Sequence, residues 1–275
     1  MLENDAVLIK SYVNKFNEAL DAIPDEPEAV NGFVPTLNKQ GYMAVNLDNY
    51  SQSFVSIPKI TINQVKLLEI GAAYGIASLQ ALNNGAIVFA NDIEIMHLAV
   101  LFNKVAESSK DRLIPVVGKF PDELDFPENY FDGILISRVM HFFNGETIVK
   151  SLEKLRGWVK PEGKIYIINE TPYLSNWQKF IPEYLSRKGR GIEWPGIILD
   201  PKVYANFRSG DLPDLVHWLD HDTLKHAILK AGFVDDEIES LEYINRSGQF
   251  PDDMIMPSEG RESIGCCIIK NASFM

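Results

Sequence analysis

Short, continuous apolar runs alternate with stretches of helical periodicity through the middle of the chain. Apolar runs of this length are typical of buried strands, and the stretches between them are long enough for crossover helices. The pattern predicts five strands, at residues 65–70, 86–91, 113–118, 131–137 and 164–169. Helices are expected to begin near Gly75, Ile93 and Gly145, and the Pro161-Glu162-Gly163 turn is expected to break the chain before the fifth strand.

The N-terminal part of the chain does not follow this alternation. Apolar residues recur every three to five positions up to residue 23, which predicts an amphipathic helix over residues 2–23. Residues 31–58 mix aromatic residues with Gly, Pro, Asn and Ser and have no sustained periodicity. We interpret residues 1–60 as a helix followed by an irregular segment, residues 31–58, which we call the lid.

The alternation is interrupted again at residues 171–220, which are rich in Trp, Tyr, Pro and Gly. A helix capped by Asp222 and ending at Gly232 follows, and then two strands at residues 238–244 and 263–270. The whole pattern predicts a doubly wound α/β fold with a mostly parallel sheet. Residues 61–275 would form this domain, with residues 171–220 as an insertion after the fifth strand.

Composition narrows the possible partners. The chain is 46% hydrophobic and 23% charged, which suits one main globular domain with a sizeable core. Its net charge of -12 would repel a phosphate backbone, so nucleic acid is disfavoured as a partner. No secretory signal is visible at the N-terminus, and no apolar run is long enough to cross a bilayer. We therefore expect a cytoplasmic protein without a membrane partner.

The loop after the first predicted strand is the strongest candidate for a ligand site. Gly71 and Gly75 allow the backbone to turn sharply and to present amide groups at the start of a helix. A dinucleotide fingerprint, G-x-G-x-x-G, would need glycines where Ala73 and Ile76 stand. The pattern of an acid followed by G-x-G-x-G fits better, from Glu69 onward, with Ala73 in place of the middle glycine. A bare strand-to-helix turn remains the alternative.

Four further segments extend this match. Asp92 ends the second apolar run, and three later blocks follow in order at residues 126–135, 158–164 and 229–233. With these blocks the chain resembles the class I S-adenosylmethionine-dependent methyltransferases over about residues 65–270, apart from the insertion. The resemblance implies S-adenosyl-L-methionine as the cofactor, bound by Glu69, Gly71, Ala73, Gly75, Asp92, Lys119, Phe120 and Ser137.

Two of these positions carry alternatives. In the family, an acid at the position of Asp92 accepts hydrogen bonds from both ribose hydroxyls, but Asp92 could instead cap the following helix. The family usually has an acid after the third strand that binds the adenine amino group, and Lys119 cannot accept that bond. Asp122 or a backbone carbonyl could replace it, or Phe120 could stack on the purine.

Residues for the second substrate are predicted more loosely. His141, just beyond the fourth predicted strand, is the best placed histidine for a general base, although it could simply pack beside its apolar neighbours. No pair of histidines has both the spacing and the neighbouring carboxylate residues that a metal site needs. Aromatic residues of the irregular segments could form the substrate walls: Tyr42, Tyr50, Tyr173, Trp177, Trp194 and Tyr204.

These features favour methyl transfer to an oxygen or nitrogen atom of a small molecule. One alternative is a protein or nucleic-acid methyltransferase, which a basic groove on the folded surface would favour. Another is a module that binds S-adenosylmethionine without turnover, which the departure at Lys119 keeps open.

Overall fold

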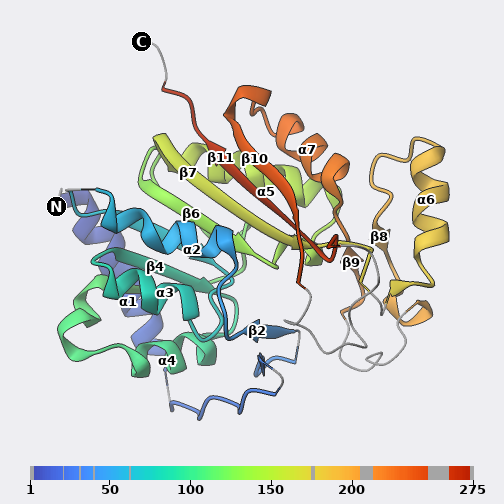
Figure 1. Cartoon of the computed structure of the whole chain (residues 1–275). Helices are drawn as coiled ribbons and strands as arrows, with labels where there is room; N and C mark the ends of the chain where they lie inside the picture. The colour runs from blue at the N-terminus through green and yellow to red at the C-terminus, as the bar shows by residue number, and fades with distance from the viewer. Residues whose placement is uncertain are drawn as a thin grey trace.

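A seven-stranded sheet forms the centre of the molecule (Figure 1). The computed structural model describes residues 3–20, 22–30, 32–39, 41–61, 63–174, 177–204, 213–246 and 260–272. The strand order is β10-β11-β7-β6-β3-β4-β5. The strands are β3 Lys66–Ile70, β4 Ile87–Asp92, β5 Leu113–Val117, β6 Phe131–Ser137, β7 Val159–Glu170, β10 Ile238–Ile244 and β11 Ser263–Ile269. Neighbours from β7 to β5 are parallel, and β11 is antiparallel to both β7 and β10. The predicted doubly wound, mostly parallel sheet is confirmed.

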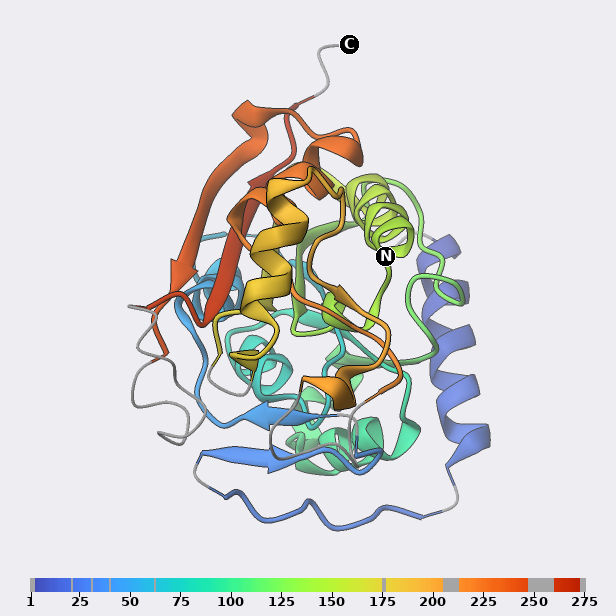
Figure 2. The same ribbon diagram turned by 90° about the vertical axis from the view of Figure 1, so that its right-hand side faces the viewer.

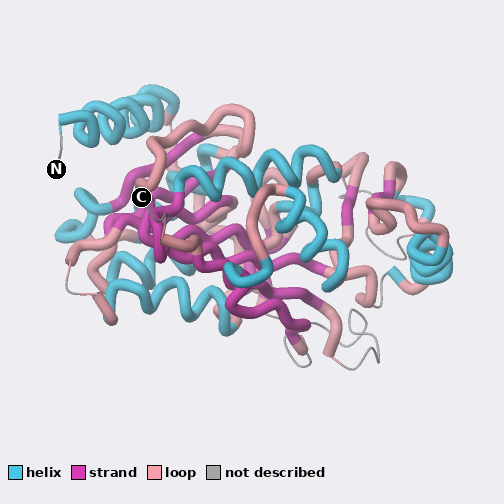
Figure 3. The backbone as a smooth tube through the Cα atoms, turned by 90° about the horizontal axis from the view of Figure 1, so that it is seen from above, coloured by secondary structure: helices cyan, strands magenta, loops and turns pink. Residues whose placement is uncertain are grey.

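Helices cover both faces of this sheet, as the view from above shows (Figure 3). One apolar core contains residues of α2 Asn49–Ser56, α3 Ile76–Asn83 and α4 Ile95–Lys104. The opposite core contains residues of α5 Gly145–Trp158 and α7 His221–Lys230. Helix α1, Glu3–Ala19, places Phe16 in the first core and Tyr12 against the second, and it packs beside β5. It therefore covers the edge of the sheet at β5.

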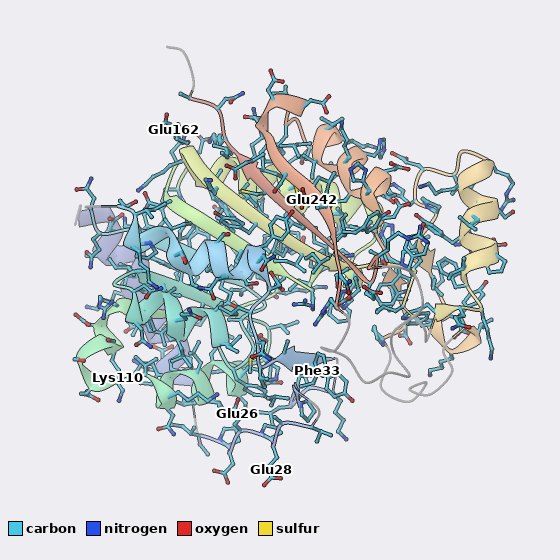
Figure 4. All side chains as sticks on the ribbon, viewed as in Figure 1. Glu26, Glu28, Phe33, Lys110, Glu162 and Glu242 are labelled. Carbon is cyan, nitrogen blue, oxygen red and sulfur yellow. The ribbon has the colours of Figure 1, made fainter. Side chains whose placement is uncertain are left out.

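The lid is more regular than the sequence indicated. Within residues 31–58, β1 Phe33–Pro35 pairs with β2 Tyr42–Ala44, and α2 follows with Asp48 as its N-cap. The prediction of an irregular segment was wrong because each element is too short to show a period along the sequence. Figure 2 shows the two paired strands at the bottom of the molecule, joined to α1 by an extended stretch. Figure 4 labels Glu26 and Glu28 on this stretch and Phe33 in β1.

The fifth strand of the predicted series also begins earlier than expected. Strand β7 starts at Val159, which pairs with Phe131, and the register then shifts so that Lys164 pairs with Gly133. The turn that was predicted to precede the strand is thus an irregularity within it. It is held by the residue that follows β11, because the Glu162 N–H donates to the Lys270 carbonyl at 2.7 Å.

The interruption after β7 contains its own small elements. They are α6 Ile181–Gly189 and the antiparallel pair β8 Ile197–Ile198 and β9 Val216–His217. Trp177, Phe180 and Tyr184 lie in its apolar cluster. Helix α7 begins at His221, because Asp220 and not the predicted Asp222 is its N-cap and accepts the Thr223 N–H at 3.0 Å.

Short 3-10 helices complete the described structure, at Ile57–Lys59, Glu107–Arg112, Met140–Phe142, Pro201–Val203 and Asp235–Glu237. Within the described ranges, no helix combines the length and the apolar character needed to cross a membrane.

Candidate functional site

A cavity of about 1110 Å³ lies where the carboxyl ends of β3, β4, β6 and β7 meet. The loop after β3 and the ends of the neighbouring strands form one side of it, and the lid and the insertion form the rest. Ligand pockets in proteins commonly enclose roughly 300–1,000 Å³. The cavity therefore has room for a nucleoside-sized molecule and a second small molecule.

The loop after β3 has the backbone that the glycine pattern predicted. Gly71 and Gly75 have φ angles of 72° and 75°, and a Cβ at Gly75 would lie 2.2 Å from Leu101 Cδ1. Ala73 also takes a left-handed φ of 46°, which costs free energy for a residue with a side chain. Gly71 and Ala73 line the cavity directly, whereas Gly75 shapes the turn as the N-cap of α3.

Asp92, at the end of β4, is held by main-chain donors. Its Oδ2 accepts the Ala73 N–H at 2.9 Å, and its Oδ1 accepts the Glu94 N–H at 2.9 Å. The N-cap of α4 is Glu94, whose side chain accepts the Met96 N–H. Asp92 is thus not the helix cap, and its carboxylate lies in the cavity wall beside the glycine loop.

Glu69 lies on the same wall and is almost completely buried. The Ser78 hydroxyl donates to Glu69 Oε2 at 2.5 Å. Burial raises the pKa of this carboxyl group to about 7, and the nearby Asp92 charge acts in the same direction. A cationic ligand beside Glu69 would favour its ionised form.

The end of β5 supplies the next stretch of wall, with Lys119, Phe120 and Asp122. Phe120 is 4% exposed, and its ring lies 6.1 Å from that of Trp158. Asp122 pairs with Lys150 at 2.7 Å, and this hydrogen bond lowers the pKa of the Asp122 carboxyl group. The Asp122 carboxylate can therefore accept a hydrogen bond in this stretch of the wall, which the Lys119 ammonium group cannot do.

A buried ionic cluster forms the wall at the ends of β6 and β7. Glu170 Oε1 accepts hydrogen bonds from Arg138 Nε at 2.8 Å and from Arg246 Nη1 at 2.6 Å, and Glu170 Oε2 accepts the Ser263 hydroxyl. Burial opposes ionisation of Glu170, but the two arginines keep its pKa below the ordinary value. Burial lowers the pKa of Arg246 to about 10. Ser137 lines the cavity here, and its hydroxyl accepts from Arg138 Nη1.

The sequence reasoning missed this cluster, although part of its signal was present. Arg138 and Glu170 each directly follow a predicted strand, and the carboxyl ends of neighbouring parallel strands meet at one edge of a sheet. Arg246 could not be selected in this way. It follows β10, which pairs with the antiparallel β11 and not with one of the parallel strands.

His141 lies in the 3-10 helix after β6 and lines the cavity. Its ring is 5.5 Å from that of Trp218, and its Nδ1 has no hydrogen-bond partner among the described residues. Burial lowers the pKa of the imidazole to about 4, so the ring is neutral near pH 7. A neutral imidazole can accept a hydrogen bond, but a pKa this low makes it a weak base.

Two of the six predicted aromatic wall residues, Tyr42 and Trp177, line the cavity. The Trp177 ring lies 4.9 Å from that of Trp218, which the sequence reasoning had not selected. The other four lie outside the cavity because they pack elsewhere: Tyr50 against Gly265, Tyr173 against Tyr184 and Tyr243, Trp194 against His217, and Tyr204 against Phe180.

In the part of the chain that the structure describes, no three His, Cys, Asp or Glu side chains are grouped as a metal would require. The polar groups that line the cavity are carboxylates, guanidinium and ammonium groups, amides, hydroxyls and imidazoles.

Residues 68–167 match the family model described as a methyltransferase domain. No curated protein sequence matches the chain significantly.

Solved structures are similar at the level of the fold. An S-adenosylmethionine-dependent methyltransferase from Methanosarcina mazei superposes with a TM-score of 0.58 at 14% identity, over 83% of this chain and 100% of that one. One from Mesorhizobium loti has a TM-score of 0.55 at 14% identity, over 80% and 98%. The 1,6-didemethyltoxoflavin N1-methyltransferase of Burkholderia thailandensis, with bound 1,6-didemethyltoxoflavin and S-adenosylhomocysteine, has a TM-score of 0.54 at 18% identity, over 98% and 90%.

Proposed function

Because the chain carries an S-adenosylmethionine-dependent methyltransferase domain, we propose that the protein methylates an oxygen or nitrogen atom of a small molecule. The observation that carries this proposal is the single continuous cavity. It extends from the glycine loop and Asp92 to an enclosed wall of Trp177, Trp218 and His141. A cavity of this kind suits a cofactor at one end and a small acceptor at the other.

The residues at the first end fit S-adenosylmethionine. The turn at Gly71 leaves no room for a side chain, since a Cβ there would lie 2.3 Å from Val139 Cγ2. The Asp92 carboxylate is fixed at the edge of this turn, where Oδ2, which among the described residues accepts only the Ala73 N–H, can also accept a hydrogen bond from the ribose. The residues proposed to hold the cofactor are Glu69, Gly71, Ala73, Asp92, Lys119, Phe120 and Ser137, while the predicted Gly75 shapes the loop as the N-cap of α3.

The second end suits an acceptor with an apolar, flat part. Tyr42 comes from the lid and Trp177 and Trp218 from the insertion, so the acceptor would be enclosed by the two segments outside the sheet. The Burkholderia enzyme supports a small acceptor, because it is similar over 98% of this chain and holds 1,6-didemethyltoxoflavin. The net charge of -12 argues against a nucleic-acid acceptor.

His141 is the proposed general base where the acceptor atom carries a proton that must leave. S-adenosylmethionine, when bound, supplies a methyl group on a sulfonium, so the protein mainly has to hold the acceptor in line with it. The His141 ring is neutral near pH 7, and with a pKa lowered to about 4 it can take the proton only as methyl transfer makes the acceptor hydroxyl strongly acidic. Arg138 and Glu170 fix the polar edge of the cavity beside it through the hydrogen bond from Arg138 Nε to Glu170 Oε1.

Calorimetric titration with S-adenosylhomocysteine tests the cofactor end of this proposal. Incubation with S-adenosylmethionine and a metabolite mixture, followed by measurement of S-adenosylhomocysteine, tests turnover. We expect binding in the first experiment and acceptor-dependent product in the second. Binding without product from metabolites, proteins or nucleic acids would instead identify a module that binds the cofactor without turnover.

A further inference from the structure

The lid packs directly on the cofactor loop and on α4. Val34 of β1 shares a small buried cluster with Tyr74 and Val100, and the Tyr74 hydroxyl donates to the Pro35 carbonyl at 2.8 Å. Lid residues from Phe33 to Asp48 also line the cavity. The position of the lid and the shape of the proposed cofactor site therefore depend on the same contacts.

His97 joins these two parts through hydrogen bonds on both ring nitrogens. It lies on α4 and is 1% exposed. Its Nε2 is 3.0 Å from the Leu37 N–H of the lid, and its Nδ1 is 3.1 Å from Asp92 Oδ1. A backbone amide can only donate, so Nε2 must be the acceptor and the ring hydrogen lies on Nδ1. This tautomer donates to Asp92 and accepts from Leu37 at the same time.

The chain of hydrogen bonds continues beyond Asp92. The second carboxylate oxygen accepts the Ala73 N–H, so a continuous path leads from Leu37 through His97 and Asp92 to the glycine loop. The ring of Tyr74 meets that of His97 edge to face at 5.1 Å and limits its rotation. Each bond in the path is buried or partly buried, where hydrogen bonds are least weakened by competing water.

We propose that His97 is a positioning residue that couples closure of the lid to the orientation of the Asp92 carboxylate. This inference rests on the proposed function, in which Asp92 holds the cofactor ribose. Binding of the cofactor then favours the closed lid, and the closed lid strengthens cofactor binding by the same factor, because coupling between two equilibria is reciprocal. His97 does not touch the reacting atoms and is not a catalytic residue.

Three substitutions separate the two bonds. In His97→Asn the amide nitrogen can reach the place of Nδ1 and keep the bond to Asp92, but the bond to Leu37 is lost. In His97→Gln the amide oxygen can reach the place of Nε2 and keep the bond to Leu37, but the bond to Asp92 is lost. His97→Phe keeps the ring and loses both bonds. His226→Phe, on the exposed side of α7, is the matched control.

The dissociation constant of S-adenosylhomocysteine and hydrogen exchange of the Leu37 amide are measured for each variant. We expect His97→Phe to weaken binding by about 10- to 100-fold, as for the loss of a hydrogen bond to a charged group. His97→Gln should weaken binding and leave the exchange of Leu37 slow without ligand. His97→Asn should speed that exchange and also weaken binding, because the lid is released. The control should match the unaltered protein in both measurements.

Two outcomes would overturn the inference. Binding within twofold of the unaltered protein in His97→Phe would show that His97 only fills space. Slow Leu37 exchange in His97→Asn and His97→Phe would show that the lid is held without it. If the unaltered protein does not bind S-adenosylhomocysteine, the proposed function fails, and the Leu37 exchange in the unliganded variants still decides whether His97 holds the lid.

Discussion

At the scale of single residues, the carboxylates were predictable and their partners were not. Glu69 and Asp92 stand at fixed positions beside the glycine loop, so the sequence was enough to select them. The bonds that orient Asp92 come from Ala73, Glu94 and His97, and only Ala73 belongs to the recognised motif. The hydrogen bond between His97 and Asp92 depends on how α4 is rotated in the fold. The spacing of residues in a short sequence motif does not predict this rotation.

Asp92→Asn should weaken cofactor binding because both carboxylate oxygens accept main-chain N–H groups. An amide group would place a second donor against either the Ala73 or the Glu94 N–H and would also offer the ribose one acceptor fewer. We expect a loss of about 1 to 3 kcal/mol in the binding of S-adenosylhomocysteine, measured by calorimetry. An unchanged affinity would remove Asp92 from the cofactor site.

Glu69→Gln should change how stability depends on pH. The pKa of Glu69 is raised to about 7 in the folded protein, so the unfolded chain ionises first and the folded state loses stability as pH rises from the unfolded value toward 7. We expect the free energy of unfolding of the unaltered protein, relative to Glu69→Gln, to fall by about 2 kcal/mol between pH 5.5 and 8. Urea unfolding at four pH values measures this, and parallel curves would contradict it.

His141→Phe should separate catalysis from packing. The substitution keeps a ring beside Trp218 and Phe142 and removes the nitrogen that could take a proton. With a hydroxyl acceptor, we expect kcat to fall by about 10²- to 10⁴-fold while the affinity for S-adenosylhomocysteine stays within twofold. A kcat close to that of the unaltered protein would show that His141 is a packing residue of the cavity wall.

At the scale of elements, long buried strands were predictable and short elements were not. The five parallel strands are continuous apolar runs, and their cores agree with the predicted ranges to within a few residues. Strands β1 and β2 have three residues each and α2 has eight, so none of them shows a period that stands out from its neighbours. These short elements form the lid, and the part of the cavity proposed to enclose the acceptor was therefore predicted less well than the sheet.

Gly196→Ala should disturb the insertion without disturbing the cofactor loop. A Cβ at Gly196 would lie 1.8 Å from the carbonyl oxygen of Trp218, which is a backbone atom and cannot rotate away. We expect a loss of about 1 to 3 kcal/mol in the free energy of unfolding and an altered near-ultraviolet tryptophan signal, with cofactor affinity within twofold.

The matched control is Gly189→Ala, at the end of α6, where no atom lies within 4 Å of the added Cβ. It should leave the tryptophan signal unchanged and should not lower stability. Equal stability of the two variants would contradict the close approach of Gly196 to Trp218.

At the scale of the whole molecule, the cavity is assembled from segments that are far apart along the chain. Its walls reach from Val30 in the N-terminal segment to Arg246 after β10. The convergence of parallel strand ends is a property of the fold class, so the sequence could predict the edge of the sheet at which the cavity lies. Which side chains of the lid and of the insertion reach that edge depends on tertiary packing, and this explains why Trp218 was missed while Tyr50 was selected.

Because the proposed cofactor end of this cavity includes both the sheet and the lid, its ligand should stabilise the molecule as one unit. At one hundred times its dissociation constant, S-adenosylhomocysteine should add about 2.7 kcal/mol to the free energy of unfolding. For a chain of this size, that is a rise in Tm of about 5 to 10 °C, measured by calorimetry. NAD at the same concentration should leave Tm unchanged, because Ala73 and Ile76 occupy positions where a dinucleotide loop needs glycine. A rise with NAD and none with S-adenosylhomocysteine would assign the glycine loop to the other cofactor.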